Sequence, residues 1–255
     1  MNLEFSKTTT KNFTSTPQKI RELSERWTEE NIFCPNCGRK IKKLANNKKA
    51  SDFFCTNCLE NYEQKASQKK FKGKVISSEY KTIITRLQET DKPNFFFLHY
   101  LASAHSVNDF FVVPKYFFVP EIIEKRKALS ENARRSGWVG SYILFSRIPD
   151  SGKIYYVEGG REFSKKEILT KWQKTAFLRD VKKPELKGWI LDIMNCIDAL
   201  GKKEFSLNDM YSFDDALSVL HPENKHIKDK IRQQLQFLRD KNYIEFLGGG
   251  MYRLK

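Results

Sequence analysis

The chain has 255 residues, and its 46 basic residues against 31 acidic ones give a formal net charge of +15. A chain of this length buries one large core or two smaller ones, and we expect two domains. The charge predicts a polyanionic partner, and no apolar run approaches the roughly 18 residues that span a bilayer. Residues 1–16 are polar and lack the apolar stretch of a secretory signal, so we expect a cytoplasmic protein.

The first part of the chain predicts a mixed α/β domain. Ile20, Leu23 and Trp27 recur at helical spacing, and Ser164 with Glu167 forms a capping box at the start of a later helix. Short apolar runs between the helical segments predict buried strands. In chain order we expect a helix over 16–30, a helix over 77–90, strands in NFFFLHYL (94–101), DFFVVP (109–114) and KIYYVEGG (153–160), and a helix from Ser164 to about Leu178.

The second part of the chain predicts a small helical domain. Lys182, Lys183 and Pro184 interrupt the pattern and mark a linker. Three helical segments follow, over about 186–200, 206–219 and 225–241, and then a hairpin around a run of three glycines. We therefore place the domains at residues 1–181 and 182–255. The first holds 33 basic and 20 acidic residues, or +13 of the total charge, so we expect it to supply most of the grip on nucleic acid.

Four of the five cysteines form two Cys-x-x-Cys pairs, Cys34/Cys37 and Cys55/Cys58, with 17 residues between them. This spacing is typical of a structural zinc site with four thiolate ligands. A reducing cytoplasm favours thiolates over disulfides, which makes metal ligation the better interpretation. Because such a site has no open position, its zinc stabilises structure and does not activate water. Cys196 lies among apolar residues of a predicted helix, where we expect it to be buried.

The segment SDFFCTNCLENYEQKAS, residues 51–67, places Asp52, Glu63, Gln64 and Lys65 beside the second cysteine pair. If this pair forms a turn between two extended segments, Glu63 and Lys65 share one face of a strand and Gln64 lies on the other. Two carboxylates and the carbonyl of Gln64 are suitable ligands for Mg²⁺, and Lys65 can orient or deprotonate a water. Hydrolytic nucleases need this arrangement. The alternative is a solvated pair of charged strands beside a zinc knuckle.

These features resemble the DpnI-like methyl-directed, type IIM restriction endonucleases of the PD-(D/E)xK superfamily. The resemblance runs over nearly the whole chain and includes both cysteine pairs, Asp52 with Glu63-x-Lys65, and the blocks KPNFFFL, ARRSGWVG, GWILDIMNCID and HIKDKIRQQLQFLRDKNYIEFLGGGMYR. It implies a PD-(D/E)xK nuclease core with an embedded zinc site, followed by a winged-helix domain. It further implies Mg²⁺-dependent cleavage of double-stranded DNA at GATC that contains N6-methyladenine.

The resemblance places the metal-binding acids at Asp52 and Glu63 and the catalytic lysine at Lys65. Gln64 stands where the family has an apolar residue, but that residue contributes its backbone to the site. Residues 40–50 and the start of the chain diverge most from the family.

Two further regions are candidates for reading DNA. The loop over residues 131–140 contains Arg134, Arg135 and Trp138, and arginines beside an aromatic plane are typical of base-edge recognition. The resemblance implies that this loop senses methylated adenine, and Trp138 offers an apolar surface for the methyl group. The alternative is a core tryptophan with two surface arginines.

The last predicted helix leaves a polar face beside an apolar one, and the glycine-rich hairpin after it is typical of the wing of a winged helix. We expect DNA contacts from this region, although a solvated helix face is the alternative. Trp189 is either a core residue of the small domain or a second methyl sensor. The candidate residues are Trp189, His226, Lys228, Arg232 and Gln233.

The sequence therefore predicts a monomeric, site-specific deoxyribonuclease that uses Mg²⁺ and Zn²⁺ and acts on methylated double-stranded DNA. The competing hypothesis is a non-catalytic transcription regulator that uses the zinc module and the winged helix only to bind DNA. That hypothesis explains the charge and the cysteines, but it leaves Asp52, Glu63 and Lys65 without a role.

Overall fold

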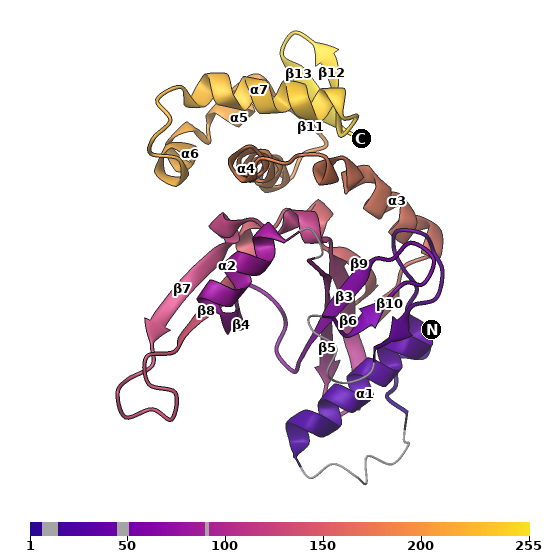
Figure 1. Ribbon diagram of the computed structural model, residues 1–255. Coiled ribbons are helices and arrows are strands. Elements are labelled where there is room, and N and C mark those ends of the chain that lie inside the picture. The colour runs from indigo at the N-terminus through magenta and orange to yellow at the C-terminus, as the bar shows by residue number, and fades with distance from the viewer. Residues whose placement is uncertain (7–14, 45–50, 90–91) are drawn as a thin grey trace. The chain divides into compact units, whose positions relative to one another are not determined.

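The structure is a computed structural model, and it describes residues 1–6, 15–44, 51–89 and 92–255 (Figure 1). Contacts between Cα atoms divide it into two compact units. Unit 1 consists of Met1–Ser146 and Ser151–Gln173, and unit 2 consists of Arg147–Asp150 and Lys174–Lys255. The boundary expected between residues 181 and 182 stays a prediction.

Unit 1 is built on a seven-stranded mixed sheet in the order β1-β2-β3-β5-β6-β9-β10. Among its described strands, only β3 and β5 run parallel to each other, and the remaining neighbours are antiparallel. The apolar runs predicted as buried strands form β5, β6 and β9, which confirms those three predictions. The strands are β1 (Lys42–Lys43), β2 (Phe53–Phe54), β3 (Asn61–Ser67), β5 (Asn94–Leu101), β6 (Ser106–Val113), β9 (Ile154–Glu158) and β10 (Arg161–Glu162).

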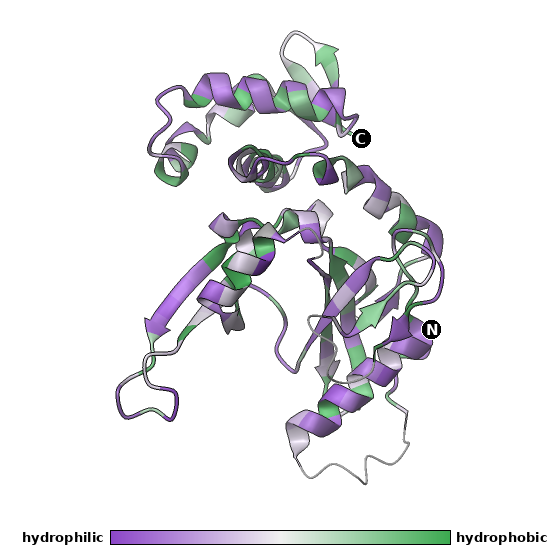
Figure 2. Cartoon of the chain, in the orientation of Figure 1, coloured by the Kyte–Doolittle hydropathy of each residue, from purple (hydrophilic) through white to green (hydrophobic). Residues whose placement is uncertain are grey.

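Aromatic side chains cover both faces of this sheet. On one face Phe96 and Phe110 pack with Trp27 of α1 (Thr16–Asn31), a mainly hydrophilic helix (Figure 2) that also buries Ser24, Glu25 and Thr28. On the opposite face Phe97 and Phe111 stack with ring centroids 5.2 Å apart. The helix predicted over 16–30 is therefore confirmed, and Ser15 caps it by accepting a hydrogen bond from the Gln18 amide. Both faces of the central strands β5 and β6 are therefore packed, and β3 pairs with β5 along most of its length.

A second, three-stranded sheet in the order β4-β8-β7 belongs to the same unit and packs against α2 (Tyr80–Gln88). Its strands are β4 (Lys74–Glu79), β7 (Ile123–Ala128) and β8 (Val139–Leu144). The sequence-based start of the helix at Ser77 is wrong, because Ser77 pairs with Ser141 of β8 and the helix begins only at Tyr80. Thr90, its expected end, lies outside the described residues.

Unit 2, all of whose residues the structure describes, contains four α-helices and a small antiparallel sheet in the order β11-β13-β12. The expected helix over 206–219 is in fact two helices, because the chain turns at Ser212 and Phe213. A capping box between Ser206 and Asp209 starts the first of them. The elements are α4 (Pro184–Leu200), β11 (Glu204–Ser206), α5 (Leu207–Tyr211), α6 (Asp214–Leu220), α7 (Ile227–Asp240), β12 (Ile244–Gly248) and β13 (Met251–Leu254).

The core of unit 2 forms between α4 and α7. Ile231, Leu235 and Leu238 are buried and form the apolar face predicted for α7, and Ile190 and Met194 of α4 are buried with them. Glycines 248–250 all adopt positive φ and turn β12 into β13, which confirms the hairpin.

The predicted capping box of α3 (Lys165–Thr175) is also confirmed, because Glu167 accepts from the Ser164 amide at 2.8 Å. Five short 3-10 helices complete the described elements: Lys115–Phe117, Pro120–Ile122, Phe145–Arg147, Asp150–Gly152 and Ala176–Arg179. Within the described residues, no helix combines the length and the apolar character needed to cross a bilayer.

Candidate metal centres and active site

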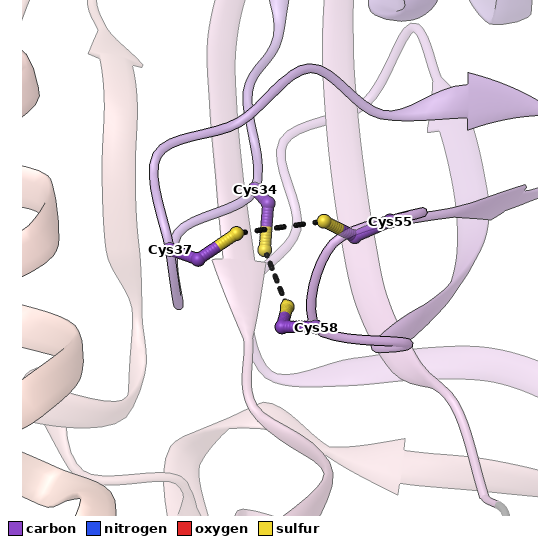
Figure 3. Close-up of side chains that lie close together, drawn as sticks. All are labelled: Cys34, Cys37, Cys55 and Cys58. Carbon is purple, nitrogen blue, oxygen red and sulfur yellow. Dashed lines mark hydrogen bonds between the residues drawn. The ribbon is translucent and has the colours of Figure 1, made fainter.

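The four paired cysteines converge on one point of unit 1 (Figure 3). Their Sγ atoms all lie within 4.8 Å of one another. The Sγ atoms of Cys34 and Cys58 are 3.4 Å apart and those of Cys37 and Cys55 are 3.5 Å apart, too far for a disulfide. Thiolates at about 2.3 Å from one tetrahedral ion lie roughly 3.8 Å from each other. The cluster is therefore compatible with zinc.

Both knuckles use the same backbone geometry. In the first, the Gly38 amide donates to the Cys34 carbonyl at 2.8 Å, and in the second the Leu59 amide donates to the Cys55 carbonyl at 2.9 Å. Gly38 and Leu59 occupy equivalent positions and both have positive φ, 72° and 61°. Glycine adopts this conformation without strain, whereas leucine does not. The tight turn thus brings each pair of sulfurs to one side.

The thiols have very different proton affinities. Burial acts to raise the pKa of Cys37, but hydrogen bonds from the Arg39 amide and from neighbouring thiols outweigh it and leave that pKa at about 7. Burial raises the pKa of Cys34 instead, although a hydrogen bond with the Tyr62 hydroxyl opposes the rise. Zinc binds thiolates, so a bound ion has to release the proton that burial holds on Cys34.

Tyr62 joins the cysteine cluster to the candidate active site. Its hydroxyl lies 3.1 Å from the Cys34 Sγ, and its ring stacks on Phe96 at 4.5 Å. Tyr62 belongs to β3, and the next residue along this strand is Glu63. The cluster thus fixes the strand that bears the predicted catalytic residues.

Asp52 lies beside the free edge of β3. Its backbone amide donates to the Tyr62 carbonyl, and its Oδ2 accepts from the Gln64 amide at 2.7 Å. Because alternate residues of a strand present their backbone groups to the same edge, the Gln64 carbonyl lies on this edge of β3 as well. This edge therefore brings together the carboxylate and the carbonyl that the sequence predicted as cation ligands.

Glu63 and Lys65 share a face of β3, as the alternation predicted. The Lys65 Nζ lies 3.1 Å from Glu63 Oε1, and the Arg86 guanidinium of α2 lies 3.2 Å from Glu63 Oε2. The Gln64 side chain turns to the opposite face and accepts from the Thr28 hydroxyl at 2.6 Å. The interpretation of Gln64 as a backbone contributor agrees with this orientation.

A cavity of about 860 Å³ lies along this edge, and Asp52, Glu63 and Gln64 line it together with Arg86 and residues of α1. Burial raises the pKa of Asp52, and the negative charges of Glu25 and Glu63 raise it further. The hydrogen bond from the Gln64 amide and the charge of Arg21 lower this pKa, but by less. A divalent cation would relieve this accumulation of negative charge. Oxygen donors of this kind suit Mg²⁺, so the residues fit the ion that the sequence predicted.

The predicted reading loop leaves its two arginines in solvent. Arg134 and Arg135 are exposed within the turn that joins β7 to β8, and Trp138 is half-buried. The Trp138 ring lies over Gly140, where a Cβ would be 2.7 Å from the ring. Trp138 is thus not part of the buried core.

The predicted contacts of the small domain lie mainly on α7. His226 precedes the helix, and Lys228, Arg232 and Gln233 are exposed on it. Arg232 donates to the Tyr211 hydroxyl of α5 at 2.7 Å and also pairs with Asp229. The helix therefore presents a polar surface opposite its buried leucines.

Trp189 is only 7% exposed, which agrees with the core alternative. Its ring stacks on His221 with centroids 3.6 Å apart, and His221 in turn contacts the buried Asp192 at 2.9 Å. Arg147 completes the charge balance by pairing with Asp192 at 3.0 Å.

Of the charged residues that line the cavity, three were not predicted from the sequence: Arg21 and Glu25 of α1, and Arg86 of α2. The spacing of Arg21 and Glu25 signals an ion pair within one helix and nothing more. Only the folding of α1 against β3 places that pair beside Asp52.

These observations define a class of protein: a mixed α/β domain with a four-cysteine cluster, followed by a domain of helices and a β-hairpin. A family model described as DpnI, Dam-replacing family, matches residues 1–181. A second, described as Dam-replacing HTH domain, matches residues 185–254. The chain therefore belongs to the Dam-replacing family, and it ends in a helix-turn-helix domain, which is a DNA-binding module. The resemblance and the fold class predicted from the sequence are both confirmed.

Proposed function

We propose that the protein is a type II restriction endonuclease that cleaves double-stranded DNA at GATC sites with N6-methyladenine. Its catalytic domain spans residues 1–181 and its winged-helix domain residues 182–255, and it acts as a cytoplasmic monomer. Membership of the DpnI family supports the activity, and the helix-turn-helix domain supports the partner. The single observation that carries the proposal is the position of Asp52, hydrogen-bonded to β3 beside Glu63 in one cavity.

In this proposal Asp52, Glu63 and the Gln64 carbonyl hold Mg²⁺ at the edge of β3. The cation, when bound, stabilises the charge that develops on the scissile phosphate. Lys65 orients the attacking water or takes its proton, since its ammonium lies beside Glu63 on the same face. Arg86 neutralises the remaining charge of Glu63 and keeps that carboxylate aimed at the cavity.

Zinc, held by Cys34, Cys37, Cys55 and Cys58, has a structural role in this proposal. All four thiolates are used as ligands, and the contact from Cys34 to Tyr62 transmits the rigidity of the cluster to β3.

Methyl recognition is divided between two regions in this proposal. Arg134, Arg135 and Trp138 read the site from the catalytic domain, while His226, Lys228, Arg232 and Gln233 read it from the small one. Free energies of methyl recognition add when both regions bind the same site, so the two selectivity factors multiply. About 1.4 kcal/mol at either region corresponds to a factor of ten. Trp189 supports the small domain from within by stacking on His221.

A plasmid assay tests the proposal. We expect the wild type to linearise dam-methylated plasmid with Mg²⁺, and to leave unmethylated plasmid or EDTA-treated reactions intact. Asp52→Ala removes a cation ligand, so cleavage should fall by at least about a hundredfold while binding to methylated duplex in Ca²⁺ persists. Glu30→Ala, an exposed acid in the last turn of α1, is the matched control and should cleave normally.

The competing regulator hypothesis predicts a different result. Binding to methylated duplex without cleavage by the wild type would favour it, and full cleavage by Asp52→Ala would refute the site assignment.

A further inference from the structure

A third carboxylate lies at the wall of the candidate active site. Glu25 of α1 lines the same cavity as Asp52 and Glu63, and it is only 4% exposed. A buried acid on a helix is costly unless its charge is compensated. The partners of the two carboxylate oxygens of Glu25 therefore indicate the role of this side chain.

The two oxygens of Glu25 have partners of different kinds. Oε2 lies 3.0 Å from the Nζ of Lys43, a residue of β1 that also pairs with Glu22 at 2.8 Å. Oε1 accepts from the Nε of Arg21 at 2.5 Å. Lys43 thus fixes the orientation of the carboxylate from the side of β1 and leaves Oε1 to Arg21.

Asp52 repeats this division. Its Oδ2 is fixed by the Gln64 amide of β3 at 2.7 Å, and its Oδ1 is contacted by the Nη2 of Arg21 at 3.1 Å. Each acid therefore has one oxygen held by a partner from the main sheet and one oxygen held by the same guanidinium. Arg21 occupies the position between the two carboxylates.

Arg21 is the exchangeable member of this arrangement. Its side chain is 63% exposed, in contrast to the buried acid that it bridges to Asp52. Because the guanidinium is already open to solvent, water can hydrate it when a divalent cation takes its place and compensates the two acids. A displaced guanidinium is then free to contact the backbone of the substrate.

The electrostatics agree with a shared site. Glu25 and Asp52 line the same cavity, so the negative charge of each disfavours the negative charge of the other, and the guanidinium of Arg21 contacts an oxygen of both. Two carboxylates that affect each other in this way bind a cation better together than either does alone.

We propose that Glu25 is a third carboxylate of the divalent-cation site, and that Arg21 bridges Glu25 and Asp52 until the cation displaces it. This inference rests on the proposed nuclease function, since it concerns the same site. It assigns to α1 a part in metal binding that the sequence pattern did not predict.

Cation binding without DNA tests the inference. Mn²⁺ affinity is measured on the zinc-loaded full-length protein by electron paramagnetic resonance, up to millimolar Mn²⁺, with Asp52→Asn as the reference for a disabled site. Glu25→Gln keeps the shape of the side chain and should weaken Mn²⁺ binding about tenfold or more. Arg21→Gln removes the competing guanidinium and should strengthen it a few-fold.

Two matched variants separate this role from a structural one. Glu22→Gln removes the other ion pair of Lys43 but does not touch the cavity, and it should leave Mn²⁺ affinity unchanged. Arg26→Gln alters an exposed arginine of α1 that pairs with Glu30, and it should also have no effect. Melting temperature and zinc content are recorded for every variant.

Equal Mn²⁺ affinity in Glu25→Gln and Glu22→Gln would overturn the inference, and so would a wild type that binds no Mn²⁺. If Glu25→Gln does not fold, the exposed Arg21→Gln still decides, because unchanged affinity there contradicts the bridge. The nuclease proposal is judged separately by cleavage. A protein that does not cut methylated plasmid but binds Mn²⁺ more weakly in Glu25→Gln would refute the nuclease and retain the cation site.

Discussion

Asp109 of β6 is a carboxylate buried in unit 1 that belongs to neither metal centre. It is 5% exposed and accepts from the Gly159 backbone amide at 2.7 Å and from the side-chain Nδ2 of Asn108 at 3.0 Å. The Nδ1 of His99 lies 2.6 Å from the same carboxylate, and because a carboxylate only accepts, this nitrogen carries the proton. Burial acts to raise the pKa of Asp109, but these hydrogen bonds and the charge of Lys70 outweigh it, and the pKa is lowered.

This shift predicts a pH-dependent contribution to stability. A carboxyl whose pKa is lower in the folded state stabilises the fold above its unfolded value, about 3.9, and the stabilisation disappears as the pH falls through the folded value. Asp109→Asn should therefore cost about 1–3 kcal/mol at pH 6, and the difference from wild type should shrink below about pH 4. Urea unfolding between pH 3 and 7 measures this.

The exposed Asp240→Asn is the control for Asp109→Asn and should show no difference from wild type at any pH. A destabilisation by Asp109→Asn that stays constant from pH 3 to 7 would show that the charge of Asp109 is not what stabilises the fold.

The candidate site shows which residues a sequence can and cannot place. Strand alternation correctly put Glu63 and Lys65 on one face, because that relation is local. Arg21 and Glu25 reach the same cavity from a helix far earlier in the chain, so their role depends on packing that no local pattern encodes. Leu59 illustrates the same limit. In the first knuckle the glycine at position 38 already indicates a positive φ, whereas the positive φ of Leu59 in the second knuckle is visible only in the structure.

At the scale of elements, the hairpin of β2 and β3 connects the cysteine cluster to the candidate cation site. The second knuckle, Cys55–Cys58, is the turn of this hairpin, and its strands place Asp52 and Glu63 on either side. The site therefore depends on the knuckle being closed.

Opening the knuckle should damage the active site indirectly. Cys55→Ser removes a buried ligand, and we expect loss of the zinc ion and partial unfolding of unit 1, with a lower melting temperature and cleavage reduced in proportion. Atomic absorption and near-UV circular dichroism measure the two effects. Cys196→Ser, a buried cysteine of α4 outside the cluster, should keep a full equivalent of zinc. A folded, zinc-loaded Cys55→Ser protein would show that the thiolate is dispensable.

Helices and strands were predicted well where burial produces a pattern of apolar residues in the sequence, and poorly where it does not. The apolar run of β5 is readable because both faces of the strand are covered. The strand β7, with the sequence IEKRKA, was missed because its four consecutive charged residues leave no alternation of apolar and polar side chains. Without β7 and β8, the residues of β4 look like the first turn of the helix that follows them.

At the scale of the whole molecule, charge is distributed unevenly between the two predicted domains. Residues 1–181 hold 33 basic and 20 acidic side chains, whereas residues 182–255 hold 13 and 11. Phosphate contacts release counterions, so each one steepens the dependence of binding on salt. Residues 182–255 have almost no net charge, so in the proposed function their contribution to DNA binding comes from a few cations on α7.

If both parts engage the same duplex, cations removed from either should have measurable and independent effects. The double variants Arg134→Ala/Arg135→Ala and Lys228→Ala/Arg232→Ala are compared for binding to methylated duplex in Ca²⁺, over a series of salt concentrations. Each cation that binds a phosphate should, when removed, lower the slope of log K against log salt by about 1, whereas removal of a base-reading side chain should reduce methyl preference instead. The decreases in binding free energy should add in the quadruple variant to within about 0.5 kcal/mol.

The exposed pair Lys166 and Lys171 of α3 lies outside the predicted contact residues, and its double alanine variant should match the wild type in slope and in methyl preference. If the Arg134/Arg135 variant or the Lys228/Arg232 variant also matched the wild type in salt slope and in methyl preference, the region that carries the unchanged pair would not contact the duplex. Recognition would then come from the other part alone, because selectivity multiplies only when two readers bind the same site.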